Sequence, residues 1–168
     1  MLHFDSQTGR LLHDEHMATI ELLQALETLL DRHGAKKAPD LADPEIRLTL
    51  SNTEASLNRE ISRHFGFEEE HLFPLLANLG QVGMTYMLKA EHDAILPVAV
   101  DIARIAHDAL AAWTITPESW KQFHELAQEL IEREACHIQK EEMGLLAALA
   151  ALVDAGEDAR LATIFRSL

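Results

Sequence analysis

The chain has 168 residues, 48% of them apolar, and its 14 basic and 28 acidic side chains give a formal charge of −14. This length predicts one domain over residues 1–168, with enough apolar side chains to bury a core. So acidic a surface repels phosphate backbones and anionic lipid heads, which argues against nucleic acid and membrane surfaces as partners. Leucine and alanine dominate the apolar set, and valine is rare, so the composition predicts helices and nearly excludes a β-rich fold.

The cysteine content and the start of the sequence bear on the compartment. Cys136 is the only cysteine, so no disulfide can form within the chain and nothing requires an oxidising environment. The first residues lack the basic segment and apolar run of a signal peptide. No stretch reaches the roughly 18 apolar residues that a membrane-spanning helix needs. We therefore expect a cytoplasmic protein.

Caps, prolines and glycines predict four long helices in chain order. Gly34 is a natural end for the first helix, while Asp43-Pro44 and Thr116-Pro117 each read as an N-cap followed by a helix-opening proline. The predicted helices span about 8–33, 43–78, 83–113 and 116–153, and a short outer helix follows at about 157–165. Short connections between long amphipathic helices make neighbours antiparallel, so we predict an all-α, up-down antiparallel four-helix bundle.

Each predicted helix carries an apolar stripe with steps of three and four residues, and each stripe contains a histidine. The second stripe continues through His71 and Leu75, and the fourth passes through Arg133. Polar groups do not enter a core without partners, because desolvation costs several kcal/mol. The polar stripe residues that we select as candidate ligands are four histidines, with a glutamate one turn after the second and the fourth: His16, His64, His92, His137, Glu68 and Glu141.

The candidate ligands also form an internal repeat. A Glu-His pair occurs at residues 15–16 and again at 91–92, and a His-x-x-x-Glu-Glu pattern occurs at 64–69 and again at 137–142. A rise of about 1.5 Å per residue puts His92 and His137 at similar depths from the connection between their helices. Two helical hairpins facing each other would therefore bring all six residues into one layer of the bundle.

Four neutral imidazoles and two carboxylates in a dry core predict a metal site. Thiolate is absent from the set, since Cys136 adjoins His137 on the helix and points elsewhere, and mixed nitrogen and oxygen ligands suit iron or manganese and permit zinc. Six side chains are too many for one ion but suit two, because each carboxylate can bridge. With an oxo or hydroxo bridge between two octahedral ions, coordination positions remain open for dioxygen, nitric oxide or peroxide.

These residues resemble the motifs of the hemerythrin-like (HHE cation-binding) family. The resemblance rests on His16, on Glu91-His92 and on two longer segments, 64–69 running into Leu72-Phe73-Pro74, and 137–142. It extends over roughly residues 11–152. It implies a four-helix bundle that holds a non-haem di-iron centre, two iron ions with an oxo or hydroxo bridge, with manganese or zinc less favoured.

Two positions depart from the oxygen-carrying hemerythrins. Those proteins have a second histidine where this chain has Leu96, and they take a carboxylate ligand from the position of Glu142 rather than Glu141. The chain is similar instead to the branch with four histidines and two glutamates, which includes iron–sulfur-cluster repair proteins and iron- or oxygen-sensing domains. The aliphatic Leu96 leaves one further coordination position open in apolar surroundings, unless water, His13 or His71 fills it. An open position favours turnover over reversible oxygen carriage.

The predicted function is therefore to bind or react with dioxygen, peroxide or nitric oxide, in redox or nitrosative defence, sensing or iron handling. The alternative is an oxygen- or iron-binding or sensing module without turnover, and whether the protein is an enzyme stays open. The sequence contains no flavin motif and no cysteine pair, so redox turnover would need an external electron donor. The oligomeric state also stays open.

The remaining polar residues have expectations of their own. We expect His13 and His71 either at the solvent edge of the site or in contact with its ligands. We expect Glu69 and Glu142 to face sideways or outward, with Glu142 the alternative carboxylate ligand. Three glutamates can either hydrogen-bond the imidazoles or lie on a solvated helix face: Glu15, Glu91 and Glu134.

Six further residues are not predicted to belong to the site. Cys136 is expected to be a small buried hydrophobic residue, and Tyr86 is expected to pack in the ordinary way. The four remaining histidines are expected on the surface: His3, His33, His107 and His124.

Overall fold

The computed structural model describes residues 6–168, and the elements in this range are helices. Three short π-helical segments continue two of the long helices, so that residues 44–78 and 117–152 each run on as one irregular helix. The α-helices are α1 (Gln7–His33), α2 (Pro44–Arg59), α3 (Phe73–Asn78), α4 (Val82–Ala112), α5 (Pro117–Lys140), α6 (Leu146–Leu152) and α7 (Ala155–Ser167). The π-helical segments are η1 (Glu60–Phe65), η2 (Glu68–Leu72) and η3 (Glu141–Leu145).

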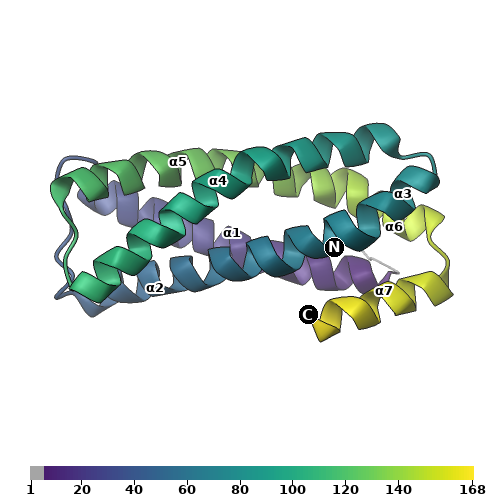
Figure 1. The fold of residues 1–168 in the computed structure, drawn as a ribbon, viewed down its shortest axis with the longest axis horizontal. Helices are drawn as coiled ribbons and strands as arrows, with labels where there is room; N and C mark the ends of the chain where they lie inside the picture. The colour runs from purple at the N-terminus through teal and green to yellow at the C-terminus, as the bar shows by residue number, and fades with distance from the viewer. Residues whose placement is uncertain (1–5) are drawn as a thin grey trace.

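The long helices form the predicted antiparallel four-helix bundle. Around the bundle α1 packs on α2, α2 on α4, α4 on α5, and α5 back on α1 (Figure 1). The connections 34–43 and 113–116 lie together at one end, and the turn at 79–81 lies at the other. None of the helices within residues 6–168 combines the length and the apolar character needed to cross a lipid bilayer.

Local sequence signals set the helix ends close to where the pattern predicts them. Thr116 caps α5 by accepting the backbone N–H of Ser119, and a proline occupies the first helical position of both α2 and α5. Gly34 ends α1 with φ of 61°, a left-handed conformation that costs glycine nothing, and its N–H donates to the carbonyl of Leu30 at 2.7 Å.

The apolar core is divided into two clusters by a polar layer. Along α1, Leu12 belongs to one cluster and Leu23 to the other, with His16 between them. Along α4, Leu88 and Ile95 lie in the same two clusters on either side of His92. Each bundle helix thus leaves one cluster, passes through the polar layer and enters the other.

The π-helical segments change which residues face the core. Downstream of Glu68 the fully buried side chains are Leu72 and Leu76, whereas His71 and Leu75 are only half-buried. The sequence prediction placed His71 and Leu75 in the stripe and is wrong there, because a π-helical turn with i→i+5 hydrogen bonds takes up one residue more than an α-helical turn.

A second correction concerns α5. Arg133, which the stripe included, is exposed, and Glu134 is buried in its place. Steps of three and four residues from Leu130 to His137 pass equally well through either position, so periodicity alone does not distinguish them.

The last helix, α7, extends the predicted 157–165 helix at both ends and packs on the outside of α1 (Figure 1). The carboxylate of Asp158 accepts hydrogen bonds from Ser6 Oγ at 2.7 Å and from the backbone N–H groups of Gln7 at 2.7 Å and Thr8 at 3.0 Å. It therefore satisfies donors at the start of α1 that have no partner within that helix. At the other end of α7, the ring of Phe165 packs against Phe67, 4.9 Å between centroids.

Candidate metal centre

Six polar side chains from all four sides of the bundle meet in the layer between the two apolar clusters. Each of them is at most 2% exposed. They come from α1, η1, η2, α4, α5 and η3, and they are the six candidate ligands that the sequence predicts: His16, His64, Glu68, His92, His137 and Glu141.

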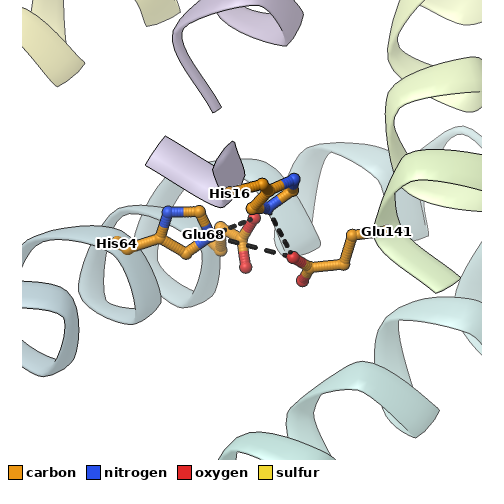
Figure 2. A group of neighbouring side chains, drawn as sticks. All are labelled: His16, His64, Glu68 and Glu141. Atoms are coloured by element: carbon orange, nitrogen blue, oxygen red, sulfur yellow. Dashed lines mark ion pairs between the residues drawn. The ribbon is translucent and has the colours of Figure 1, made fainter. Parts of the chain in front are cut away.

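The six residues fall into two overlapping groups that could each hold a metal ion. One group contains His16 and His64, the other contains His92 and His137, and both contain the same two carboxylates, Glu68 and Glu141. Within each group the potential ligand atoms lie within 4.8 Å of one another. Figure 2 shows the first group, with its side chains turned toward one another.

Each of the two shared carboxylates presents one oxygen to each histidine pair. Glu141 Oε2 lies 3.0 Å from His16 Nε2, and Glu141 Oε1 lies 3.1 Å from His137 Nε2. Glu68 Oε1 lies 3.4 Å from His64 Nε2, and Glu68 Oε2 lies 3.4 Å from His92 Nε2. Both carboxylates therefore stand where they could bridge two ions.

The outward-facing nitrogen of every imidazole is hydrogen-bonded to a further glutamate. Because an ionised carboxylate only accepts hydrogen bonds, Nδ1 carries a proton, and in the neutral imidazole the lone pair of Nε2 then faces the centre of the layer. The four pairs are His16 with Glu142 at 2.6 Å, His64 with Glu15 at 3.2 Å, His92 with Glu69 at 2.9 Å and His137 with Glu91 at 3.0 Å. We call these four glutamates the outer carboxylates.

The donor set at the centre of the layer fits a cation. Both oxygens of Glu68, both oxygens of Glu141 and Nε2 of His16 are buried without a hydrogen-bond partner. With their Nδ1 atoms protonated, His92 and His137 also turn two acceptor nitrogens toward each other at 3.1 Å. Buried acceptors without donors are costly, and a bound metal ion satisfies several of them at once.

The electrostatics of the layer indicate what replaces a metal when none is bound. Burial lowers the pKa of His16 and of His92, but the neighbouring carboxylates, which stabilise the protonated imidazoles, outweigh burial and raise the two pKa values to about 9 and about 10. Burial likewise raises the pKa of Glu141, but the imidazoles of His137 and His16 beside it hold that pKa well below its usual range. In the absence of a metal, protons on the imidazoles balance the carboxylates, so metal binding releases protons.

Each outer carboxylate has a cationic or titratable partner farther out. Glu15 lies 3.3 Å from Arg63, Glu69 lies 3.4 Å from Lys89, and Glu142 lies 3.0 Å from His13. The fourth, Glu91, pairs with Lys140. Their negative charge is thereby offset locally, close to the surface of the bundle.

Aromatic rings enclose the side of the layer around His92. The ring of Phe65 stacks on the imidazole of His92 at 3.8 Å, and that of Phe73 lies 5.3 Å away. Leu96, which the sequence analysis expected to supply the apolar surroundings of an open metal position, is 38% exposed. The enclosing apolar surface therefore comes from phenylalanines, and the role given to Leu96 is wrong.

Sequence reasoning missed two of the outer carboxylates. Glu69 and Glu142 were expected to face sideways or outward, yet each accepts a hydrogen bond from an imidazole on a neighbouring helix. Both follow directly after a central glutamate, and the doublets at 68–69 and 141–142 are the signal that marks them. Of the three residues left open, Glu15 and Glu91 hydrogen-bond imidazoles, and Glu134 is buried rather than solvated.

Other expectations outside the layer also need correction. His124, expected on the surface, is buried beside Trp120, with 6.1 Å between ring centroids. Cys136 and Tyr86, expected to be packed, are both exposed. Cys136 directly precedes the inward-facing His137, so its position on the helix turns it outward despite the usual preference of cysteine for the interior.

The remaining histidines lie outside both metal-binding groups. His13 hydrogen-bonds Glu142, and His71 is half-buried against the ring of Phe67. His107 is exposed, His33 is half-buried, and His3 lies outside the described residues.

Comparison with known proteins places the helices and the polar layer in one family. The family model described as the hemerythrin HHE cation binding domain matches residues 8–149. This range includes all six residues of the layer and ends within α6, so that α7 lies beyond it. A search of curated proteins found no match.

Proposed function

Because the chain belongs to the hemerythrin HHE cation-binding family, we propose that its polar layer binds two iron ions and that the loaded centre binds or reacts with dioxygen, peroxide or nitric oxide. One observation carries this proposal. Two fully buried carboxylates each face two histidine pairs, and their oxygens have no hydrogen-bond donor. Such a pair of carboxylates suits two ions held side by side.

The ligand assignment follows from the two groups. His16 and His64 would hold one ion, His92 and His137 would hold the other, and Glu68 and Glu141 would be shared by both. Imidazole and carboxylate ligands without thiolate favour iron or manganese, and zinc is compatible with the same donors. Iron, when bound, supplies one-electron chemistry and open coordination positions for a small ligand.

The protein residues prepare the site in three ways. The outer carboxylates fix the proton on each Nδ1 and so aim each Nε2 at the metal. The rings of Phe65 and Phe73 keep water away from His92. The near-complete burial of the six ligand residues limits access to small ligands, which is why we propose diatomic molecules or peroxide rather than a larger substrate.

The same enclosure supports a second candidate function. A module that holds iron or dioxygen without turnover also benefits from six ligands that are at most 2% exposed. If the centre turns over, an external electron donor is required, since the protein contains a single cysteine and no flavin motif. We place this activity in the cytoplasm, in redox or nitrosative defence, sensing or iron handling.

Metal analysis of protein purified without air tests the proposal. We expect two iron ions per chain and a new near-ultraviolet absorption band when the protein meets air. One ion per chain, or zinc alone after growth with ample iron, would contradict the di-iron assignment. Consumption of added dioxygen, peroxide or nitric oxide beyond one equivalent per centre separates turnover from simple binding.

A further inference from the structure

The four side chains that pair with the outer carboxylates differ in their exposure and in their contacts. Lys89, Lys140 and His13 are 43%, 42% and 34% exposed in their side chains. Arg63 is 30% exposed, and its guanidinium is covered by the ring of Phe165, with 4.8 Å from the guanidinium carbon to the ring centroid. Among these four partners, the structure gives Arg63 a contact with α7.

A continuous series of contacts leads from α7 to the polar layer. Arg63 Nη2 donates to the backbone carbonyl of Phe165 at 3.3 Å, and Arg63 Nε lies 3.3 Å from Glu15 Oε1. The other oxygen of Glu15, Oε2, accepts a hydrogen bond from His64 Nδ1 at 3.2 Å. His64 is thus separated from α7 by two side chains, each of which touches the next.

The α7 end of this series is itself firmly docked. Phe165 is 1% exposed and packs edge-on against Phe67, the residue before the bridging Glu68. Asp158 fixes the start of α7 to the first turn of α1 by accepting from Ser6 Oγ and two backbone N–H groups. α7 lies beyond residues 8–149, the part of the chain that matches the family, so this support is an addition to the four-helix domain.

We propose that Arg63 is a positioning residue for the metal centre and that α7 holds it in place. The inference rests on the proposed metal-binding function. Glu15 is 26% exposed in its side chain, and loss of Arg63 removes the ion pair to Oε1 that orients this carboxylate beside His64. The imidazole of His64 then samples orientations that do not aim Nε2 at the ion. Metal binding by His16 and His64 would be weakened, whereas His92 and His137 would keep their own outer carboxylates.

Titration of metal-free protein with iron(II) in the absence of air tests the proposal. We expect Arg63→Met to lower the affinity for one of the two iron ions roughly tenfold. This is the lower end of the effect seen when residues that hydrogen-bond metal ligands are removed. Arg63→Lys should recover part of the loss. Phe165→Leu, which keeps an apolar side chain but removes the ring, should lower the affinity for the same ion. The matched control is Arg160→Met, because Arg160 pairs with Glu157 of the same helix, and the iron(II) affinity of this variant should equal that of the wild type.

A double-variant cycle identifies the route of the effect. If Arg63 acts through Glu15, adding Arg63→Met to Glu15→Gln should cause little further loss of affinity. Adding Arg63→Met to Lys140→Met should give the sum of the separate losses, because Lys140 supports Glu91 and His137 in the other half of the layer. Full additivity with Glu15→Gln would overturn the proposal.

A second readout needs no metal and separates this inference from the proposed function. In ¹⁵N spectra of the metal-free protein, Arg63→Met and Phe165→Leu should shift the imidazole signals of His64 and leave those of His92 in place. Wild-type protein that binds no iron would contradict the proposed function, yet the spectra would still decide whether Arg63 positions His64. Folded variants with unchanged His64 signals and unchanged iron(II) affinity would overturn the positioning role.

Discussion

At the scale of single residues, the distinction between central and outer carboxylates decides what each substitution should do. Glu68 is fully buried, faces both histidine pairs and has no hydrogen-bond donor on either oxygen. Glu142, in contrast, is partly exposed and engaged with Nδ1 of His16 and with His13. In the proposed two-ion centre a central carboxylate would serve both ions, whereas an outer carboxylate would serve one ion through its histidine.

We predict that Glu68→Ala lowers the iron content from two ions per chain to one or none, because a bridging ligand is lost to both. Iron analysis after loading without air measures this. Glu70→Ala is the matched control, since Glu70 is an exposed glutamate two residues away and should leave the iron content unchanged. Two ions retained in Glu68→Ala would show that this carboxylate does not bridge.

Glu142→Gln should behave differently, and it addresses whether Glu142 or Glu141 is the ligand. Glutamine can still accept from Nδ1 of His16, so we predict that both ions are retained, with one bound roughly ten- to a hundredfold more weakly. Glu141→Gln should lose at least one ion. Iron(II) titration of the two variants side by side makes the comparison, and the opposite order of effects would assign the ligand to Glu142.

At the scale of elements, the sequence predicts the residues of the site better than it predicts the local geometry of the helices that carry them. The His-x-x-x-Glu spacing places His64 with Glu68 and His137 with Glu141 on one face, and all four meet where expected. The π-helical turns at η1, η2 and η3 have no comparable signal, because they arise from how the helix accommodates its neighbours. Their effect is the shift from His71 and Leu75 to Leu72 and Leu76 as core residues.

The outer carboxylates show a second limit of the sequence. A stripe argument sorts residues by the face of their own helix, whereas Glu69 and Glu142 act on imidazoles of other helices, His92 and His16. Which neighbouring ring reaches them depends on the spacing and rotation of packed helices. The Glu-His pairs at 15–16 and 91–92 share this property, since each glutamate bonds the histidine of a different helix from the one beside it.

The junction between α1 and α7 leads to a prediction about pH. Burial raises the pKa of Asp158, but hydrogen bonds from Ser6, Gln7 and Thr8 outweigh it and lower the pKa below its usual value of 3.8. A carboxylate whose pKa is depressed on folding stabilises the fold above its unfolded pKa, and this contribution is lost as the pH falls through the depressed value.

We therefore predict that Asp158→Asn lowers the free energy of unfolding by about 1–3 kcal/mol near neutral pH, because donors at the start of α1 lose a charged acceptor. The difference from wild type should shrink as the pH is lowered below about 3.8. Urea unfolding of both proteins at a series of pH values measures the difference. A gap that stays constant down to acid pH would mean that the ionised carboxylate contributes nothing specific.

At the scale of the whole molecule, the polar layer is both the site and an interruption of the core. The apolar clusters on either side consist of buried side chains, and six polar side chains lie between them. Among these six, the carboxylate oxygens of Glu68 and Glu141 and Nε2 of His16 have no hydrogen-bond partner. The formal charge of −14 adds general repulsion within the folded chain. Metal binding therefore relieves a local cost in the middle of the fold, and stability and metal content should be linked.

We predict that the melting temperature rises with the concentration of free iron(II), because a ligand that binds only the folded chain stabilises it by RT ln(1 + [L]/Kd). This term reaches about 4 kcal/mol per site at a thousandfold excess over Kd. Thermal unfolding of metal-free protein, followed by circular dichroism without air at increasing iron(II), measures the effect. Glu68→Ala should show a much smaller rise with iron(II) than wild type, because the substitution removes a carboxylate that both histidine pairs face. A melting temperature of Glu68→Ala that rises with iron(II) as steeply as that of wild type would show that the stability of the layer does not depend on metal held by this carboxylate.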